Sequence, residues 1–107
     1  MTALPQWAVG GRGVVSVTSN LLPTRMVELW AQFKGGNLES ARRIHTQLLP
    51  LFDGLFMETN PVPIKTLVAH HTGLCKPVFR LPLTPIGDAT MDQLRGLCTS
   101  LEIELAP

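Results

Sequence analysis

Val14-Val15-Ser16-Val17-Thr18 is the stretch that decides how this sequence folds. Four of its five residues are β-branched, and it lacks the polar alternation of a half-exposed strand, a pattern typical of a strand buried inside a parallel sheet. No second comparable run occurs among the 107 residues. A lone buried strand has no partner for its backbone N–H and C=O groups. The sequence thus predicts a strand and offers nothing for it to pair with.

The rest of the sequence has helical patterns. Pro23 suits a first helical turn, apolar residues follow at helical spacing, and Gly35-Gly36 ends the segment. A second helix is expected from the cap at Asn37 to Phe56, with a kink near His45–Thr46 because Pro50 removes a backbone donor.

Prolines and an aspartate mark the later elements. Asn60 is the expected cap of a third helix, with Pro61 and Pro63 in its first turn and Gly73 at its end. The stretch 81–85 is expected to run extended, because a residue that precedes proline avoids helical geometry. Asp88 is the expected cap of a last helix. The expected fold class is mostly α.

Composition excludes several classes of function. Nine Lys and Arg against eight Asp and Glu leave a net charge of +1, which predicts neither nucleic-acid binding nor an acidic tail. The longest uncharged stretch, 13–24, is too polar to span a membrane, and the first residues lack the pattern of a signal peptide. Two isolated cysteines fit a reducing cytosol, so a cytoplasmic location is expected.

The sequence gives only weak evidence for a metal or phosphate site. Gly10-Gly-Arg-Gly13 lacks the preceding strand and the Lys-Ser/Thr ending of a phosphate loop, so we interpret it as a turn. His70, His71, Cys75 and Cys98 show no zinc-ligand spacing. His71 is expected at the edge of the core and His70 in solvent, and no metal or cofactor is expected.

The evidence for catalytic side chains is equally weak. The carboxylates of Glu58, Glu102 and Glu104 are scattered, and the Glu102/Glu104 pair is expected in solvent. None of Lys34, Lys65 and Lys76 is embedded in a strand, where a desolvated amine that forms a Schiff base would lie, and Lys34 and Lys65 are expected in solvent. The residues by themselves do not predict an enzyme.

Three stretches change this interpretation. They are Gly10-Gly-Arg-Gly-Val-Val-Ser-Val-Thr-Ser-Asn20, Leu55-Phe-Met-Glu-Thr-Asn-Pro-Val-Pro-Ile-Lys65 and Arg80-Leu-Pro-Leu-Thr-Pro85. In this order and spacing they resemble the C-terminal part of the dihydrodipicolinate synthase (4-hydroxy-tetrahydrodipicolinate synthase) family, over essentially all 107 residues. The second and third stretches favour this synthase over its sister branch, the N-acetylneuraminate lyases.

The resemblance implies a fold. The family has a (β/α)8 TIM barrel followed by a C-terminal helical domain, in a homotetramer. Residues 1–36 would then be the C-terminal remnant of the barrel (end of helix 7, strand 8 at 13–18 and helix 8 at 23–34), and residues 37–107 the helical domain. The partners of the lone strand would be the first and seventh barrel strands, which this sequence does not contain.

The resemblance also implies a chemistry. The family condenses pyruvate, held as a Schiff base on a strand lysine, with aspartate semialdehyde during lysine and diaminopimelate biosynthesis. That lysine and the proton-relaying tyrosine would lie upstream, and the sequence contains no Tyr. One site position maps here: Val15, whose backbone carbonyl would contact pyruvate. We therefore expect a fragment that is inactive by itself.

Two alternatives remain open. One is a non-enzymatic helical interaction module that pairs with a full-length synthase or with itself. The apolar fraction of 45% is more than a free-standing chain of this length usually buries, which favours a covered surface. The other is a truncated pyruvate aldolase of the sister branch.

Overall fold

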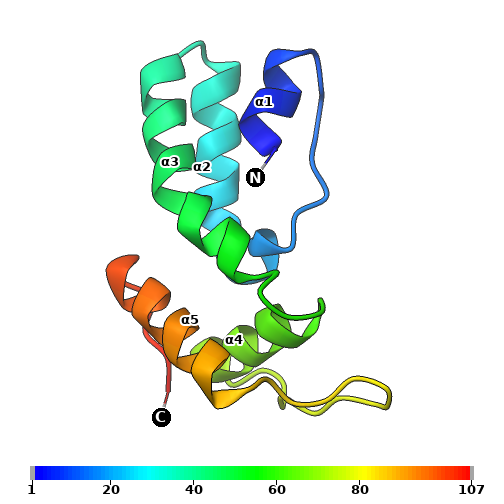
Figure 1. Ribbon diagram of the computed structural model, residues 1–107. Helices are drawn as coiled ribbons and strands as arrows, with labels where there is room; N and C mark the ends of the chain where they lie inside the picture. Colours follow the sequence, from blue (N-terminus) through cyan, green and yellow to red (C-terminus); the bar gives the residue numbers. More distant parts are fainter. Residues whose placement is uncertain (1, 107) are drawn as a thin grey trace.

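A computed structural model describes residues 2–106 as two layers of helices (Figure 1). The upper layer contains α1 (Ala3–Ala8), α2 (Pro23–Lys34) and the first part of α3 (Leu38–Gly54), with the short 3-10 helix η1 (Thr18–Asn20) at its lower end. The lower layer contains α4 (Val62–Thr72) and α5 (Asp88–Ser100). None of the helices described over 2–106 is long and apolar enough to cross a membrane.

The upper layer is held by an apolar cluster between α1, α2 and α3. Trp7 is almost fully buried there, and its ring meets that of Trp30 edge-on, with centroids 4.9 Å apart. Leu29 is completely buried, which stabilises the folded state by roughly 1.5–3 kcal/mol relative to exposure. The buried members are Ala3, Trp7, Met26, Leu29, Ala41, Ile44, Leu48 and Phe52.

A second apolar cluster joins the two layers. Its buried members are Leu21, Leu51, Leu55, Ile64, Leu67, Leu94, Cys98 and Ile103. Helix α3 contributes to both clusters: Ala41, Ile44, Leu48 and Phe52 belong to the first, and Leu51 belongs to the second. The helix continues through Pro50 and changes direction toward its end (Figure 1). Helix α3 is therefore the element that fixes one layer on the other.

Most of the expected helices are present, with small shifts at their ends. The helix over 23–34 is confirmed, and the next begins directly after Asn37 but ends at Gly54, before Phe56. The third helix starts one residue later than predicted, because Pro61 takes the cap position expected for Asn60. Gly73 ends it with a left-handed φ of 66°, as a C-terminal glycine commonly does. Gly87, not Asp88, caps α5.

Two expectations about extended structure were wrong. Residues 13–18 do not form a strand: residues 11–16 run without regular structure, and Thr18 begins η1. Within 2–106 the chain contains no strand with which this segment could form a ladder. The stretch 81–85 is not extended throughout, because a turn in which the Leu83 N–H donates to the Arg80 carbonyl (3.0 Å) precedes Thr84.

Candidate functional site

The segment from Gly11 to Val17 is the unusual part of the surface. It runs along the outside of α1 and α2 from one end of the upper layer to the other (Figure 1). The Trp7 indole Nε1 donates to the Gly13 carbonyl (3.2 Å), which fixes the start of the segment. At its other end, the Ser19 hydroxyl donates to the Ser16 carbonyl (2.6 Å). The segment is thus anchored at both ends to the helices around it.

The middle of the segment has no partners. Among the described residues, no backbone N–H from Arg12 to Val17 donates a hydrogen bond, and the Val15 carbonyl accepts none. The Val15 side chain is fully exposed, which is unusual for a β-branched apolar residue. Beneath the segment lies a small hollow of about 190 Å³, reaching Met26, Phe52 and Phe56. The Val15 position is therefore accessible from outside.

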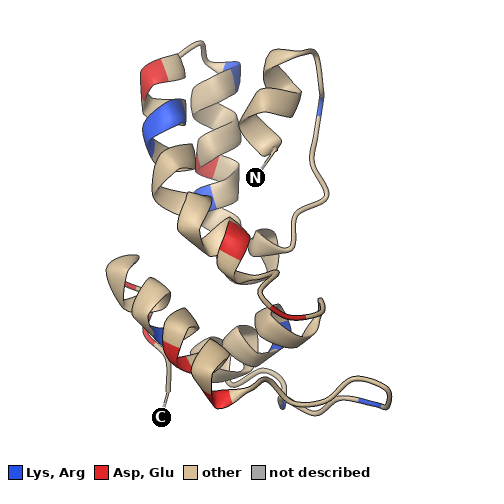
Figure 2. Ribbon diagram, in the orientation of Figure 1, with Lys and Arg blue, Asp and Glu red and all other residues tan. Residues whose placement is uncertain are grey.

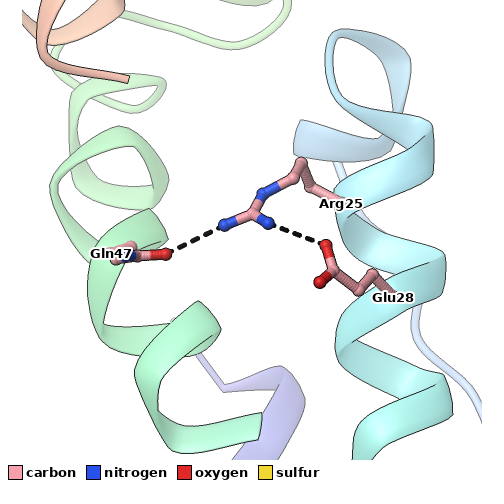
Figure 3. Close-up of polar contacts among 3 residues, drawn as sticks. All are labelled: Arg25, Glu28 and Gln47. Carbon is pink, nitrogen blue, oxygen red and sulfur yellow. Dashed lines mark hydrogen bonds and ion pairs between the residues drawn. The ribbon is translucent and has the colours of Figure 1, made fainter. Parts of the chain in front are cut away.

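An arginine joins α2 to α3 on the face beside the lower layer (Figure 3). One terminal nitrogen of Arg25 donates to Glu28 at 2.7 Å, and the other donates to the Gln47 side-chain oxygen at 2.9 Å. Arg25 and Gln47 border a cleft of about 660 Å³, whose other wall includes His71 and residues 100–103. Only part of this group is predictable from the sequence, because Arg25 and Glu28 have helical i, i+3 spacing but Gln47 is remote in sequence.

The arm between α4 and α5, residues 74–87, is tied to the preceding elements by two side chains. The Lys65 ammonium donates to the Val78 carbonyl (2.5 Å) and lies over the Phe79 ring. Glu58 accepts a hydrogen bond from the Gly87 N–H (3.0 Å). The prediction that Lys65 lies in solvent was wrong, because its side chain is half-buried against the arm, as is that of Glu58. They connect the second stretch quoted above to the residues that flank the third, Val78 and Phe79 before it and Gly87 after it.

The other lysines and the C-terminal carboxylates are exposed. Lys34, Glu102 and Glu104 are exposed as predicted, and Lys76 is exposed as well. The turn interpretation of Gly10-Gly-Arg-Gly13 is confirmed: Gly10 has a φ of 102°, and the Gly11 N–H donates to the Gln6 carbonyl at 2.9 Å. None of these groups lies beside Val15 in the hollow described above.

The two histidines exchange their expected places. His70 is half-buried and His71 is exposed: the chain after α5 contacts both, but His70 also lines a hollow with Pro77 and Phe79 of the arm. The Nδ1 atom of His71 lies 2.7 Å from the Glu104 carbonyl, and that of His70 lies 3.3 Å from the Ala106 carbonyl. These contacts attach the C-terminal segment to α4.

The cysteines are free and lie in different surroundings. Cys75 is exposed, whereas Cys98 is buried, and burial raises the pKa of the Cys98 thiol to about 11. A thiol with so high a pKa is a poor nucleophile and a poor metal ligand. Over residues 2–106, no three His, Cys, Asp or Glu side chains gather closely enough to hold a metal ion.

Comparison with known proteins gives the family. A model of the dihydrodipicolinate synthetase family matches residues 1–101. The 4-hydroxy-tetrahydrodipicolinate synthase of Nitratidesulfovibrio vulgaris is 42% identical over 102 residues, which cover 95% of this chain and 35% of the relative. The chain belongs to the dihydrodipicolinate synthetase family, as its three motif stretches predicted. It spans about a third of the length of the curated relatives it matches.

Solved structures agree with this assignment. The crystal structure of dihydrodipicolinate synthase from Thermotoga maritima superimposes with a TM-score of 0.91 at 39% identity, covering 96% of this chain and 35% of that one. The Acinetobacter baumannii enzyme complexed with pyruvate gives a TM-score of 0.88 at 31% identity, with 96% and 35% coverage. The arrangement of helices described here therefore occurs within larger dihydrodipicolinate synthases.

Proposed function

We propose that this chain acts as the C-terminal portion of a 4-hydroxy-tetrahydrodipicolinate synthase, and that it functions only when joined by the rest of a barrel. Residues 1–36 complete the (β/α)8 barrel, and residues 37–107 form the helical domain. The observation that carries this proposal is the segment Arg12–Val17. It is anchored at both ends, lacks hydrogen-bond partners among the described residues, and has the composition of a buried strand. A barrel would supply both neighbours.

Val15 is the residue of this chain that we place beside the substrate. Active sites of barrels lie at the C-terminal ends of their strands. The Acinetobacter baumannii relative binds pyruvate, and we propose that the Val15 carbonyl contacts pyruvate in the completed site. Its carbonyl is free to do so, because no described donor occupies it. The contact is made by main chain, so the identity of the side chain has little direct effect on it.

The nucleophile of the reaction lies outside this chain in our proposal. A lysine that forms a Schiff base must be desolvated, so that its amine is neutral near pH 7. Lys34 and Lys76 are exposed. The Lys65 amine is held as a donor to the Val78 carbonyl. The chain therefore orients substrate, and the barrel it completes supplies the lysine that forms the Schiff base with pyruvate before condensation with aspartate semialdehyde.

The proposal also extends to the oligomeric state, cofactor requirement and location of the completed protein. The completed protein is a homo-oligomer, a tetramer as in the family, and needs no metal or cofactor. The cytoplasm is its proposed location, in keeping with two cysteines that are free in the structure.

Complementation tests the proposal. The Thermotoga maritima synthase, truncated before the third that this chain matches, is mixed with the present chain and assayed with pyruvate and aspartate semialdehyde. We expect neither piece to be active alone and the mixture to be active. A parallel assay with N-acetylneuraminate tests for the lyase of the sister branch. Turnover by this chain alone, or an inactive mixture in which the two pieces bind each other, would refute the proposal.

A second candidate is a non-enzymatic module that pairs with a full-length synthase. The observation in its favour is the arm, which exposes three large apolar side chains, Leu74, Val78 and Leu81. Apolar side chains grouped on one projecting segment are typical of protein contacts. Co-purification with the full-length Thermotoga maritima synthase, and loss of that binding in Leu81→Asp, would support this function. Binding to the truncated synthase but not to the full-length one would favour the first candidate, completion of a barrel.

A further inference from the structure

We propose that Phe56 sets the size of the 2-oxo acid that the completed synthase accepts, by packing its ring against the methyl end of pyruvate. This inference rests on the proposed function, because it needs the barrel that completes the site. It assigns to this chain a second substrate-facing residue beside Val15. The two residues differ in kind, since Val15 acts through its main-chain carbonyl and Phe56 acts through its side chain.

The end of α3 lies at the catalytic end of the segment that we place in the barrel. Active sites of barrels lie at the C-terminal ends of their strands, and the segment Arg12–Val17 is followed by η1. Figure 1 shows η1 beside the last turn of α3, whose final residue is Gly54. Leu21, which follows η1, and Leu55, which follows α3, are buried in one apolar cluster. Phe56 is therefore held at the end of α3 that meets the catalytic face.

The Phe56 ring faces the segment and not the core. It belongs to neither buried cluster, and 59% of its surface is exposed. Phe56 lines the hollow of about 190 Å³ together with residues 14–18. The other aromatic side chains of residues 2–106 are buried or half-buried. Phe56 is thus the aromatic ring of this chain that is available to a ligand beside Val15.

The hollow is uncharged, which decides the end of the substrate that Phe56 meets. None of the described residues that line it carries a charge, and no charged residue occurs from Gly13 to Thr24. The charge view shows the same uncharged path along the segment to η1 (Figure 2). Pyruvate has a carboxylate at one end and a methyl group at the other, and burial of a carboxylate without a partner is costly. An apolar ring in these surroundings suits the methyl end, and the carboxylate is left to the barrel.

Contact with the methyl group makes the ring a limit on the size of the substrate. One methylene more or less in an apolar pocket changes kcat/KM by about 10–200-fold. The substrate 2-oxobutanoate differs from pyruvate by one methylene at this end. We expect the Phe56 ring to exclude that methylene, and its truncation to alanine to admit it.

The ratio of kcat/KM for pyruvate to that for 2-oxobutanoate, each with aspartate semialdehyde, tests this assignment. It is measured on the mixture of the truncated Thermotoga maritima synthase with the full present chain. Phe56→Ala should lower the ratio about tenfold or more, and Phe56→Leu should lower it less. Both substrates are assayed on the same complex, so a variant that only weakens assembly leaves the ratio unchanged.

Met57→Ala is the matched control, because Met57 is the next residue and is also exposed (48%) but does not line the hollow. It should keep the wild-type ratio. An unchanged ratio in Phe56→Ala, or an equal change in Met57→Ala, would overturn the assignment of Phe56 while the proposed function stands. A wild-type mixture that is inactive although its two pieces bind each other would refute the proposed function, and the assignment with it.

Discussion

The Lys65 ammonium lies 5.1 Å from the centre of the Phe79 ring and also donates a hydrogen bond to the carbonyl of Val78, which precedes Phe79 in the chain. Lys65 is on α4, and Phe79 is on the arm that leads to α5. One side chain therefore makes two contacts with the arm, one with its backbone and one with an aromatic face. A methionine would fill similar space but could make neither contact.

Removal of the Lys65 ammonium is expected to loosen the arm. Lys65→Met should lower the free energy of unfolding by about 1–2 kcal/mol, because a charged hydrogen bond and a cation–π contact are lost at a half-buried position. Urea unfolding gives this value, and hydrogen exchange of the arm shows where structure is lost. Lys65→Arg, which keeps charge and donors, should recover part of the stability.

The matched control for Lys65 is Lys76, a lysine of the arm itself. Its side chain is exposed and makes no hydrogen bond or ion pair in the described structure. Lys76→Met should change stability by less than about 0.5 kcal/mol, as surface substitutions usually do. Equal effects of the two methionine variants would show that the contacts of Lys65 with the arm contribute nothing.

Gly54 and Gly96 should respond in opposite ways to alanine. A Cβ added at Gly54, at the end of α3, would lie 2.6 Å from Leu97 Cδ1 and 3.3 Å from Leu94 Cδ2, so these two side chains of α5 would have to repack. Gly54→Ala should therefore destabilise the protein by about 1–3 kcal/mol. Gly96, within α5, has nothing within 4 Å of such a Cβ. Gly96→Ala should stabilise by about 0.5–1 kcal/mol through helix propensity. Thermal unfolding of both variants measures the difference.

His45 should make stability depend on pH. Its ring is buried, lies 5.7 Å from the Phe52 ring, and has an Nδ1 atom without a partner among the described residues. Burial lowers the pKa of His45 below the ordinary 6.5. Well above pH 6.5, His45 is neutral in both the folded and the unfolded state, so its protonation costs the folded state no stability. As the pH falls below 6.5, the unfolded state binds the proton first, so the free energy of unfolding decreases until folded His45 is also protonated.

Urea unfolding at a series of pH values checks this behaviour of His45. The loss of stability between pH 6.5 and the lowered pKa should be smaller in His45→Leu, which keeps an apolar side chain at the buried position and has no titratable ring. An identical pH dependence in the wild type and in His45→Leu would contradict the role assigned to this histidine.

Elements set by local signals could be predicted from the sequence. The start of α2 at Pro23 and the end of α4 at Gly73 depend on the backbone preferences of single residues, and both were predicted correctly. The buried positions Met26 and Leu29 follow from helical spacing alone. Such features need no knowledge of the rest of the chain.

Features that depend on distant residues could not be predicted. Lys65 meets Val78, and Arg25 meets Gln47, only after the helices pack. His70 lies where the arm and the chain after α5 meet α4: it lines a hollow with Phe79, and its carbonyl accepts from the Ala106 N–H. The strand predicted at 13–18 failed for the same reason: its β propensity is local, but a ladder requires a second strand, and none is present over 2–106.

Trapping with borohydride in the presence of pyruvate tests the central claim most directly. The chain, alone and mixed with the truncated Thermotoga maritima synthase, is reduced and weighed intact by mass spectrometry. Our account predicts that the mass of this chain is unchanged in both samples, while the synthase piece gains the mass of a reduced pyruvate adduct in the mixture. An adduct on Lys34, Lys65 or Lys76 of this chain would contradict the account, because the chain would then supply its own nucleophile.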